Sequence, residues 1–140
     1  MFLTEKELKN TFWENYNYSG RALRYQFECP IREGGADLVT VEKFQDNYQI
    51  NAFEFKLSDI KKVIAQAKGN IPYVNKSWIV IPEEKGQFLT QRYASYLEKE
   101  KYIGVIAVAE GGRWGVIYRP HFQKEIRINQ ALLNLMMLDF

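Results

Sequence analysis

Two acidic residues and a lysine stand at the ends of two strand-like segments. Asp37 begins the segment 36–44, and Glu54 and Lys56 lie near the end of the segment 48–57. Side chains alternate between the two faces of a strand, so Glu54 and Lys56 are expected to point the same way. The short polar stretch QDN between the segments predicts an antiparallel hairpin. Such a hairpin brings Asp37 close to the other two charged residues.

Two carboxylates beside one ammonium group suit chemistry that depends on a divalent metal. Mg²⁺ is held by one or two protein carboxylates and fills the rest of its octahedron with water and substrate phosphate. An ion held in this way lowers the pKa of a bound water and stabilises the charge that develops on a phosphodiester. The neighbouring ammonium group can position the attacking water or neutralise the phosphate. The three side chains therefore indicate metal-assisted hydrolysis of a phosphodiester.

The same residues also have a simpler interpretation. A Glu-x-Lys pair on a strand is often an ion pair that stabilises the sheet in contact with solvent. Asp37 follows Gly34 and Gly35, where an ordinary turn residue would also be found. A small α/β protein whose ion pair is structural therefore stays as one alternative.

The elements that must position these residues follow from spacing. Thr4 and Glu7 have the spacing of a capping box and predict a helix over 4–16. A short strand is expected at 24–29, and Ser58 is expected to cap a second helix with an apolar stripe. Two almost wholly apolar strands, SWIVI and YIGVIAVA, are separated by a third helix. Strands that are apolar on both faces are typical of a sheet covered by helices.

The predicted fold is therefore α/β, with a mixed central sheet flanked by helices. Its core has the order αβββαβ, with further β and α elements at the C-terminal end, and residues 1–140 are expected to form a single domain. Residues 113–119 predict an edge strand, and residues 126–140 predict a helix. The end of that helix, ALLNLMMLDF, is apolar nearly all round, so it is expected to be buried or to form a subunit contact.

This order of elements and its three charged residues resemble the PD-(D/E)XK nuclease superfamily. The resemblance covers about residues 4–82 and is carried by GGADLVTV, NAFEFKLSD, a helix with IAQA and the strand SWIVIP. It implies that Asp37 and Glu54 are metal ligands and that Lys56 is the catalytic lysine. Ala36 stands where many members have proline, a difference that changes no ligand.

The resemblance also implies two accessory residues. One group of members carries Gln-x-x-x-Tyr on the helix after the Glu-x-Lys strand, and here Gln66 is followed by Asn70 at the tyrosine position. Only Gln66 is therefore carried over as a catalytic candidate. Many members place a glutamate on the first helix, and Glu5 is the candidate because it shares a helix face with Leu8 and Phe12.

The distribution of charge along the chain indicates nucleic acid as a partner. The formal net charge is only +2, but residues 56–76 hold five lysines and a single acidic residue. This basic strip would offset the repulsion between a carboxylate site and DNA. Three of its lysines are the expected nucleic-acid contacts, namely Lys61, Lys62 and Lys68.

Other features concern the compartment and competing chemistries. Cys29 is a lone cysteine, which agrees with a reducing compartment. The longest apolar run, 103–109, is far shorter than the roughly 20 residues that span a bilayer. The polar start MFLTEKELKN lacks the apolar segment of a signal peptide, so a cytoplasmic protein without a membrane partner is expected. The chain has no P-loop, G-x-G-x-x-G, zinc-ligand spacing or G-x-S-x-G motif.

The sequence as a whole predicts an endo- or exodeoxyribonuclease that uses Mg²⁺ or Mn²⁺ and acts on DNA. The second interpretation is a catalytically silent domain of the same fold that binds nucleic acid or protein. A homodimer formed through the C-terminal segment is a further expectation, because two symmetry-related sites suit the cutting of duplex DNA.

Overall fold

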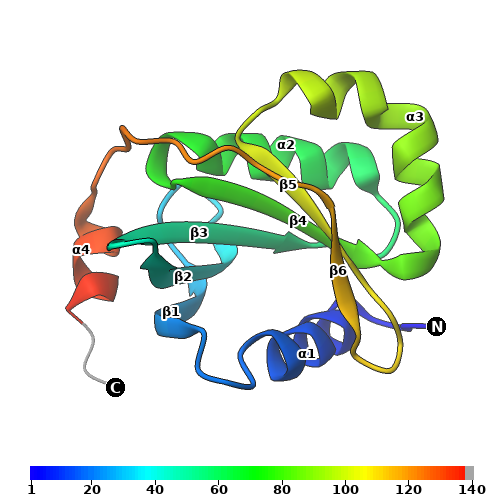
Figure 1. Cartoon of the computed structure of the whole chain (residues 1–140), viewed down its shortest axis with the longest axis horizontal. Coiled ribbons are helices and arrows are strands. Elements are labelled where there is room, and N and C mark those ends of the chain that lie inside the picture. Colours follow the sequence, from blue (N-terminus) through cyan, green and yellow to red (C-terminus); the bar gives the residue numbers. More distant parts are fainter. Residues whose placement is uncertain (138–140) are drawn as a thin grey trace.

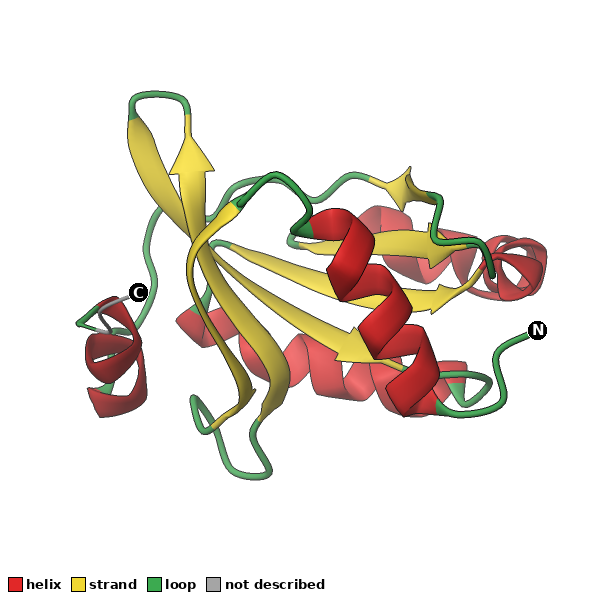
Figure 2. Cartoon of the chain, turned by 90° about the horizontal axis from the view of Figure 1, so that it is seen from below, coloured by secondary structure: helices red, strands yellow, loops and turns green. Residues whose placement is uncertain are grey.

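Residues 1–137 are described by the computed structural model, in which helices cover both faces of one mixed sheet (Figures 1 and 2). The six strands neighbour one another in the order in which they occur along the chain. They are β1 (Ala22–Cys29), β2 (Ala36–Phe44), β3 (Asn47–Phe55), β4 (Lys76–Pro82), β5 (Ile103–Val108) and β6 (Trp114–Tyr118). The first three are antiparallel, β3, β4 and β5 are parallel, and β6 is an antiparallel edge strand.

The helices form two layers on the sheet. They are α1 (Glu5–Tyr16), α2 (Ile60–Asn70), α3 (Gly86–Lys99) and α4 (Gln130–Met136), with short 3₁₀ turns at Ile71–Tyr73 and Glu83–Lys85. One core cluster joins α1 to the sheet through Phe12 and Phe53, and another joins α2 and α3 to the opposite face through Val63 and Leu89. The predicted α/β fold with a mixed sheet flanked by helices is confirmed.

The helix starts show how local sequence sets the boundaries. The Thr4 hydroxyl accepts a hydrogen bond from the Glu7 N–H at 3.0 Å, so the expected cap of α1 is confirmed. The expectation that Ser58 caps α2 is wrong. Asp59 is the cap, because its carboxylate accepts a hydrogen bond from the Lys62 N–H at 3.0 Å. A carboxylate at this position also interacts favourably with the positive end of the helix dipole.

The segment between β6 and α4, residues 119–129, crosses the start of β4 as an extended strap (Figure 1). The Gln123 N–H donates to the Asn75 carbonyl at 2.9 Å, and the Arg127 N–H donates to the Pro72 carbonyl at 2.8 Å. The helix expected over 126–140 therefore begins only at Gln130, because the backbone before it is bonded to the domain.

The short helix α4 buries one side of its apolar surface. Leu132 and Leu135 pack with Cys29 and Val39 of the hairpin strands. Leu133 on the outer side is exposed. The last residues of the expected helix, 138–140, lie outside the described residues. Within residues 1–137 every helix is too short or too polar to cross a bilayer.

Candidate active site

Asp37 and Glu54 are neighbours across the β2–β3 hairpin. Leu38 is paired with Phe53 in the antiparallel register, so the next positions toward the open end of the hairpin are Asp37 and Glu54. Residues opposite one another in this way have Cβ atoms about 4.5–5.5 Å apart and share one face of the sheet. Leu38 and Phe53 belong to the core under α1, so the two acidic residues face the layer of α2.

The carboxylate of Glu54 is fully buried and is held through one of its oxygens. Oε2 accepts a hydrogen bond from the Asn70 side chain at 2.7 Å and one from the Arg32 guanidinium at 3.1 Å. Oε1 is buried as well and has no hydrogen-bond partner among residues 1–137. Glu54 therefore carries one fixed oxygen and one acceptor whose bonding capacity is unused.

The surroundings of Glu54 oppose its ionisation. Burial is the main cause and the charge of Asp37 is the second, and together they raise the pKa of the Glu54 carboxyl to about 7. The contacts with Asn70 and Arg32 act in the opposite direction but do not outweigh them. A cation placed beside both carboxylates would favour the ionised form.

Asp37 is oriented by the backbone of the neighbouring strand. Its Oδ2 accepts a hydrogen bond from the Phe55 N–H at 2.9 Å, and the side chain is only partly buried. The second oxygen has no hydrogen-bond partner among residues 1–137. This bond holds the Asp37 carboxylate at the end of β3, next to Glu54.

Lys56 lies immediately beyond β3, which ends two residues earlier than expected, at Phe55. Its N–H donates to the Val80 carbonyl of β4 at 3.2 Å. Its ammonium group donates to the Glu5 carboxylate of α1 at 3.0 Å. The structure therefore pairs Lys56 with Glu5 of α1, while the cation paired with Glu54 is Arg32. The expected convergence of Lys56 with Asp37 and Glu54 is not seen as a direct contact, since no hydrogen bond or ion pair within residues 1–137 joins the Lys56 ammonium group to either carboxylate.

The helix α2 presents two amide side chains on one face. Gln66 lies one turn before Asn70, the residue that contacts Glu54. The Gln66 Oε1 atom is buried and, within residues 1–137, has no hydrogen-bond partner. Gln66 is therefore a second acceptor with unused bonding capacity on the helix that covers the acidic pair.

The three lysines expected to contact nucleic acid are all exposed, but they do not share one side of α2. At roughly 100° per residue, Lys62 lies about 40° from Gln66 around the helix axis. Lys61 and Lys68 lie about 140–160° from Gln66, on the flank that meets α3. The structure therefore keeps only Lys62 near the flank of the acidic pair.

Arg32 is a residue of this site that sequence reasoning missed. It lies between β1 and β2, and its Nε donates to the Asn70 Oδ1 at 2.6 Å. It packs against the open side of Gly69, where a Cβ atom would come within 3.2 Å of the Arg32 Cδ. The only signal in the sequence is that a buried glutamate needs a compensating cation.

The donor set fits a hard divalent cation with few protein ligands. No three His, Cys, Asp or Glu side chains within residues 1–137 gather closely enough to hold a metal by themselves. Mg²⁺ requires no more than one or two carboxylates from the protein. The unused Oε1 of Glu54 and the adjacent carboxylate of Asp37 are donors of this type.

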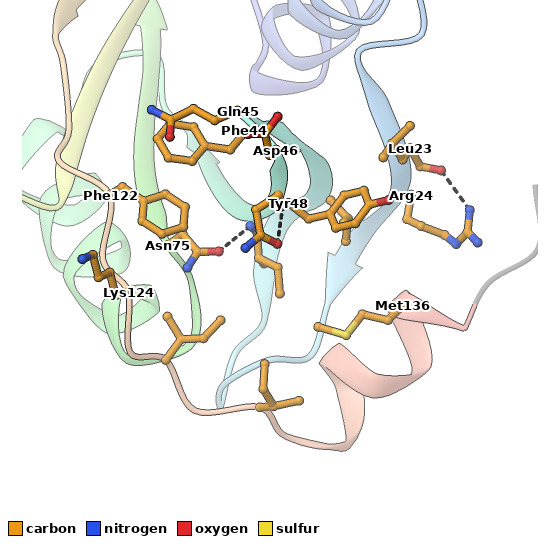
Figure 3. A pocket seen from close by; sticks show the side chains of 15 residues that line it. Leu23, Arg24, Phe44, Gln45, Asp46, Tyr48, Asn75, Phe122, Lys124 and Met136 are labelled. Carbon is orange, nitrogen blue, oxygen red and sulfur yellow. Dashed lines mark hydrogen bonds between the residues drawn. The ribbon is translucent and has the colours of Figure 1, made fainter.

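A cavity of about 1020 Å³ lies at the other end of the hairpin. Side chains of the β2–β3 turn, the strap and α4 surround it, among them Tyr48, Phe122 and Met136 (Figure 3). None of the candidate site residues lines this cavity. This cavity is therefore separate from the acidic pair and does not form part of the candidate active site.

Comparison with protein-family models, with curated proteins and with solved structures finds no match to this chain in any of the three.

Proposed function

We propose that this protein is a nuclease that hydrolyses phosphodiester bonds of DNA with Mg²⁺ or Mn²⁺. In this proposal Asp37 and Glu54 hold the ion, and Lys56 assists the attacking water. The observation that carries the proposal is the buried Oε1 of Glu54, an acceptor that has no partner among residues 1–137 and lies beside a second carboxylate. The resemblance to the PD-(D/E)XK superfamily supports the same assignment.

Each residue has a separate task in this proposal. The bound ion would supply an activated water and would offset negative charge on the phosphate. Asn70 and Arg32 fix the Oε2 atom of Glu54, so that Oε1 keeps one direction. The Phe55 N–H orients Asp37 in the same way.

Lys56 is suited to act on water or phosphate because its position is fixed. Its backbone is bonded to β4, and Glu5 holds its ammonium group at the end of β3. An ammonium group at this end of the strand stabilises negative charge that increases in the transition state. Gln66 and Glu5 are accessory residues in the proposal, and Lys62 is its nearest lysine for DNA phosphate.

The test is incubation of the purified protein with labelled duplex, single-stranded and branched DNA and with RNA. We expect cleavage of DNA with Mg²⁺ or Mn²⁺ and none with EDTA. Ca²⁺ is expected to support DNA binding without turnover, because its longer bonds and looser geometry orient water poorly.

Two variants separate catalysis from metal binding. Lys56→Ala is expected to lower the cleavage rate by roughly 10²–10³-fold while Mn²⁺ still binds, because both carboxylates remain. Asp37→Asn is expected to weaken Mn²⁺ binding itself, because a neutral amide replaces an anionic ligand. Lys43→Ala, which changes an exposed lysine of the hairpin, is the control. Cleavage by Lys56→Ala at the wild-type rate would refute the proposal.

The contact between Arg32 and Glu54 favours the second candidate, a catalytically silent domain that binds nucleic acid or protein. An arginine already compensates the charge of Glu54 at 3.1 Å, as in a purely structural ion pair. In that case no divalent metal would support cleavage of any DNA form. DNA binding would then be equal with Mg²⁺ and with EDTA.

A homodimer through the C-terminal segment remains part of the proposal. Leu133, Met136 and Met137 leave apolar side chains exposed on and next to α4. Light scattering of the wild type and of Leu133→Lys tests this contact. A dimer that dissociates in the variant is expected, whereas a monomeric wild type would contradict it.

A further inference from the structure

A small open groove lies between α2 and α3, on the flank of α2 that is turned away from Gln66 and Asn70. Its volume is about 240 Å³. The lining residues come from both helices and are Lys61, Ile64, Ala65, Lys68, Tyr93 and Tyr96. The surface of the groove is therefore almost wholly apolar. It is formed by two aromatic rings, two aliphatic side chains and the hydrocarbon parts of two lysines, and it contains no carboxylate.

The two cations of the groove stand on the same side of α2. Lys61 and Lys68 are seven residues apart, which is about two helical turns. Both are exposed, and the structure shows no salt bridge to either within residues 1–137. The groove is therefore flanked by positive charge along its length, which complements an anionic ligand.

Aromatic side chains continue beyond the groove along α3. Phe88 is exposed and packs edge-on against Tyr93, with ring centroids 6.4 Å apart. The Arg92 guanidinium lies over the Phe88 ring at 6.0 Å. Tyr93 and Tyr96 are half-buried and pack against the core between α2 and α3, so each ring has only part of its surface open to a ligand. Aromatic rings with interspersed cations are the composition that stacks bases and follows a phosphate backbone.

The size of the groove limits which ligands can bind in it. At about 240 Å³ it is smaller than the roughly 300–1,000 Å³ of sites that enclose drug-sized molecules. It suits one flat ring with charged groups on either side. A base of a single strand can meet tyrosine rings, whereas the bases of a duplex are paired and stacked and present mainly phosphates to such a groove.

We propose that this groove binds single-stranded DNA, with a base against Tyr93 and Tyr96 and the adjacent phosphates beside Lys61 and Lys68. The proposal deepens the proposed function by naming the form of the substrate, and it rests on that function for the choice of DNA. A strand bound there has to cross α2, about 10 Å in diameter, to reach Glu54. Lys62 is exposed on the side of α2 between the two places.

Binding is measured without turnover, by fluorescence anisotropy of a labelled oligothymidylate in EDTA. The double variant Tyr93→Leu and Tyr96→Leu keeps apolar packing against α2 but removes both rings. We expect it to weaken single-strand binding by at least about tenfold and to leave binding of a hairpin duplex unchanged. Tyr48→Leu, at an exposed tyrosine of the hairpin, is the matched control.

The lysines are tested separately, with surface changes that do not touch the core. Lys61→Ala with Lys68→Ala is expected to reduce the slope of log affinity against log salt by about 1.4, since each phosphate contact on a single strand contributes about 0.7. Lys43→Ala is expected to leave the slope unchanged. A wild-type slope in the double lysine variant would overturn the proposal even if the tyrosine variant failed to fold.

Other outcomes also decide the question. Wild-type affinity in the folded tyrosine variant, or an equal loss of duplex binding, would overturn the proposal. RNA binding at least tenfold tighter than DNA binding would overturn DNA as the ligand. Failure of the proposed nuclease function is distinguishable, because it would abolish cleavage with every metal and leave the anisotropy results intact.

Discussion

The side chain of Asn70 donates a hydrogen bond to the Oε2 of Glu54 at 2.7 Å. Arg32 bonds to both residues, through its Nε to the Asn70 Oδ1 and through its Nη2 to the same Glu54 oxygen. The three side chains therefore form a closed ring of contacts. This ring restrains the buried carboxylate from one side and leaves its other oxygen unused.

Removal of the arginine should destabilise the fold mainly when Glu54 is ionised. We expect Arg32→Ala to lower the free energy of unfolding by about 2–4 kcal/mol at pH 8, because it leaves a buried charge without compensation. The loss should be smaller at pH 5, where Glu54 is protonated. Urea denaturation at the two pH values measures both.

The exposed ion pair between Arg113 and Glu83 supplies the control for this variant. Arg113→Ala should cost less than about 1 kcal/mol at either pH, since exposed pairs contribute little. If Arg32→Ala and Arg113→Ala lowered the free energy of unfolding by similar amounts, the burial of Glu54 would not explain the effect of Arg32.

Stability without metal should fall as the pH rises from about 5 to 8. The pKa of Glu54 is raised to about 7 by burial and by Asp37, and burial also raises the pKa of Glu42. A carboxyl whose pKa is higher in the folded state binds its proton more tightly there, so its favourable contribution is lost as the pH rises through that value.

For Glu54 this loss should be on the order of 2 kcal/mol, measured by urea denaturation in EDTA. Glu54→Gln should flatten the pH dependence, and Glu42 should account for the remainder. The prediction would be contradicted if the free energy of unfolding of Glu54→Gln fell with pH as steeply as that of the wild type.

Gly104 should not tolerate a side chain. A Cβ atom there would lie 2.5 Å from the Pro120 ring and 2.7 Å from the Trp78 ring. Gly104→Ala should therefore lower the free energy of unfolding by about 1–3 kcal/mol, because both neighbours are rigid. Gly115→Ala on the adjacent strand meets no atom within 4 Å and should be nearly neutral. Equal thermal midpoints for the two variants would rule out this packing argument.

Cys29 should be unreactive in the folded protein. Its side chain is fully buried, and burial raises the pKa of the thiol to about 11. Because the thiolate is the reactive form, iodoacetamide should modify Cys29 only slowly until urea unfolds the chain. Mass spectrometry at increasing urea measures this, and fast modification of native protein would be the opposite result.

The hairpin and its acidic pair were predictable because they depend on local information. Strand alternation and a short polar turn determine which residues of two neighbouring strands lie opposite one another. The placement of Asp37 beside Glu54 therefore followed from the sequence. Glu5 was chosen as an accessory residue by resemblance and by its helix face, and its contact with Lys56 was not predicted.

The features of the structure that the sequence did not predict depend on tertiary contacts. Arg32 belongs to an irregular loop, whose direction is set by bonds to Asn70 and Glu54 and by the space beside Gly69. The predicted start of the C-terminal helix was wrong for a similar reason. Arg127 forms a backbone bond to Pro72, which an apolar pattern along the chain does not reveal.

The sequential order of the strands has a consequence for the time course of folding. Each strand pairs with one that has already been synthesised, and short separations between contacting residues favour fast folding. The hairpin strands can thus assemble first, and each later strand with its helix adds to an existing edge. The strap and α4 are one exception, because Asn129 donates to the Ile31 carbonyl across 98 residues of chain. Their docking should follow the assembly of the sheet, because it joins residues 119–136 to the connection between β1 and β2.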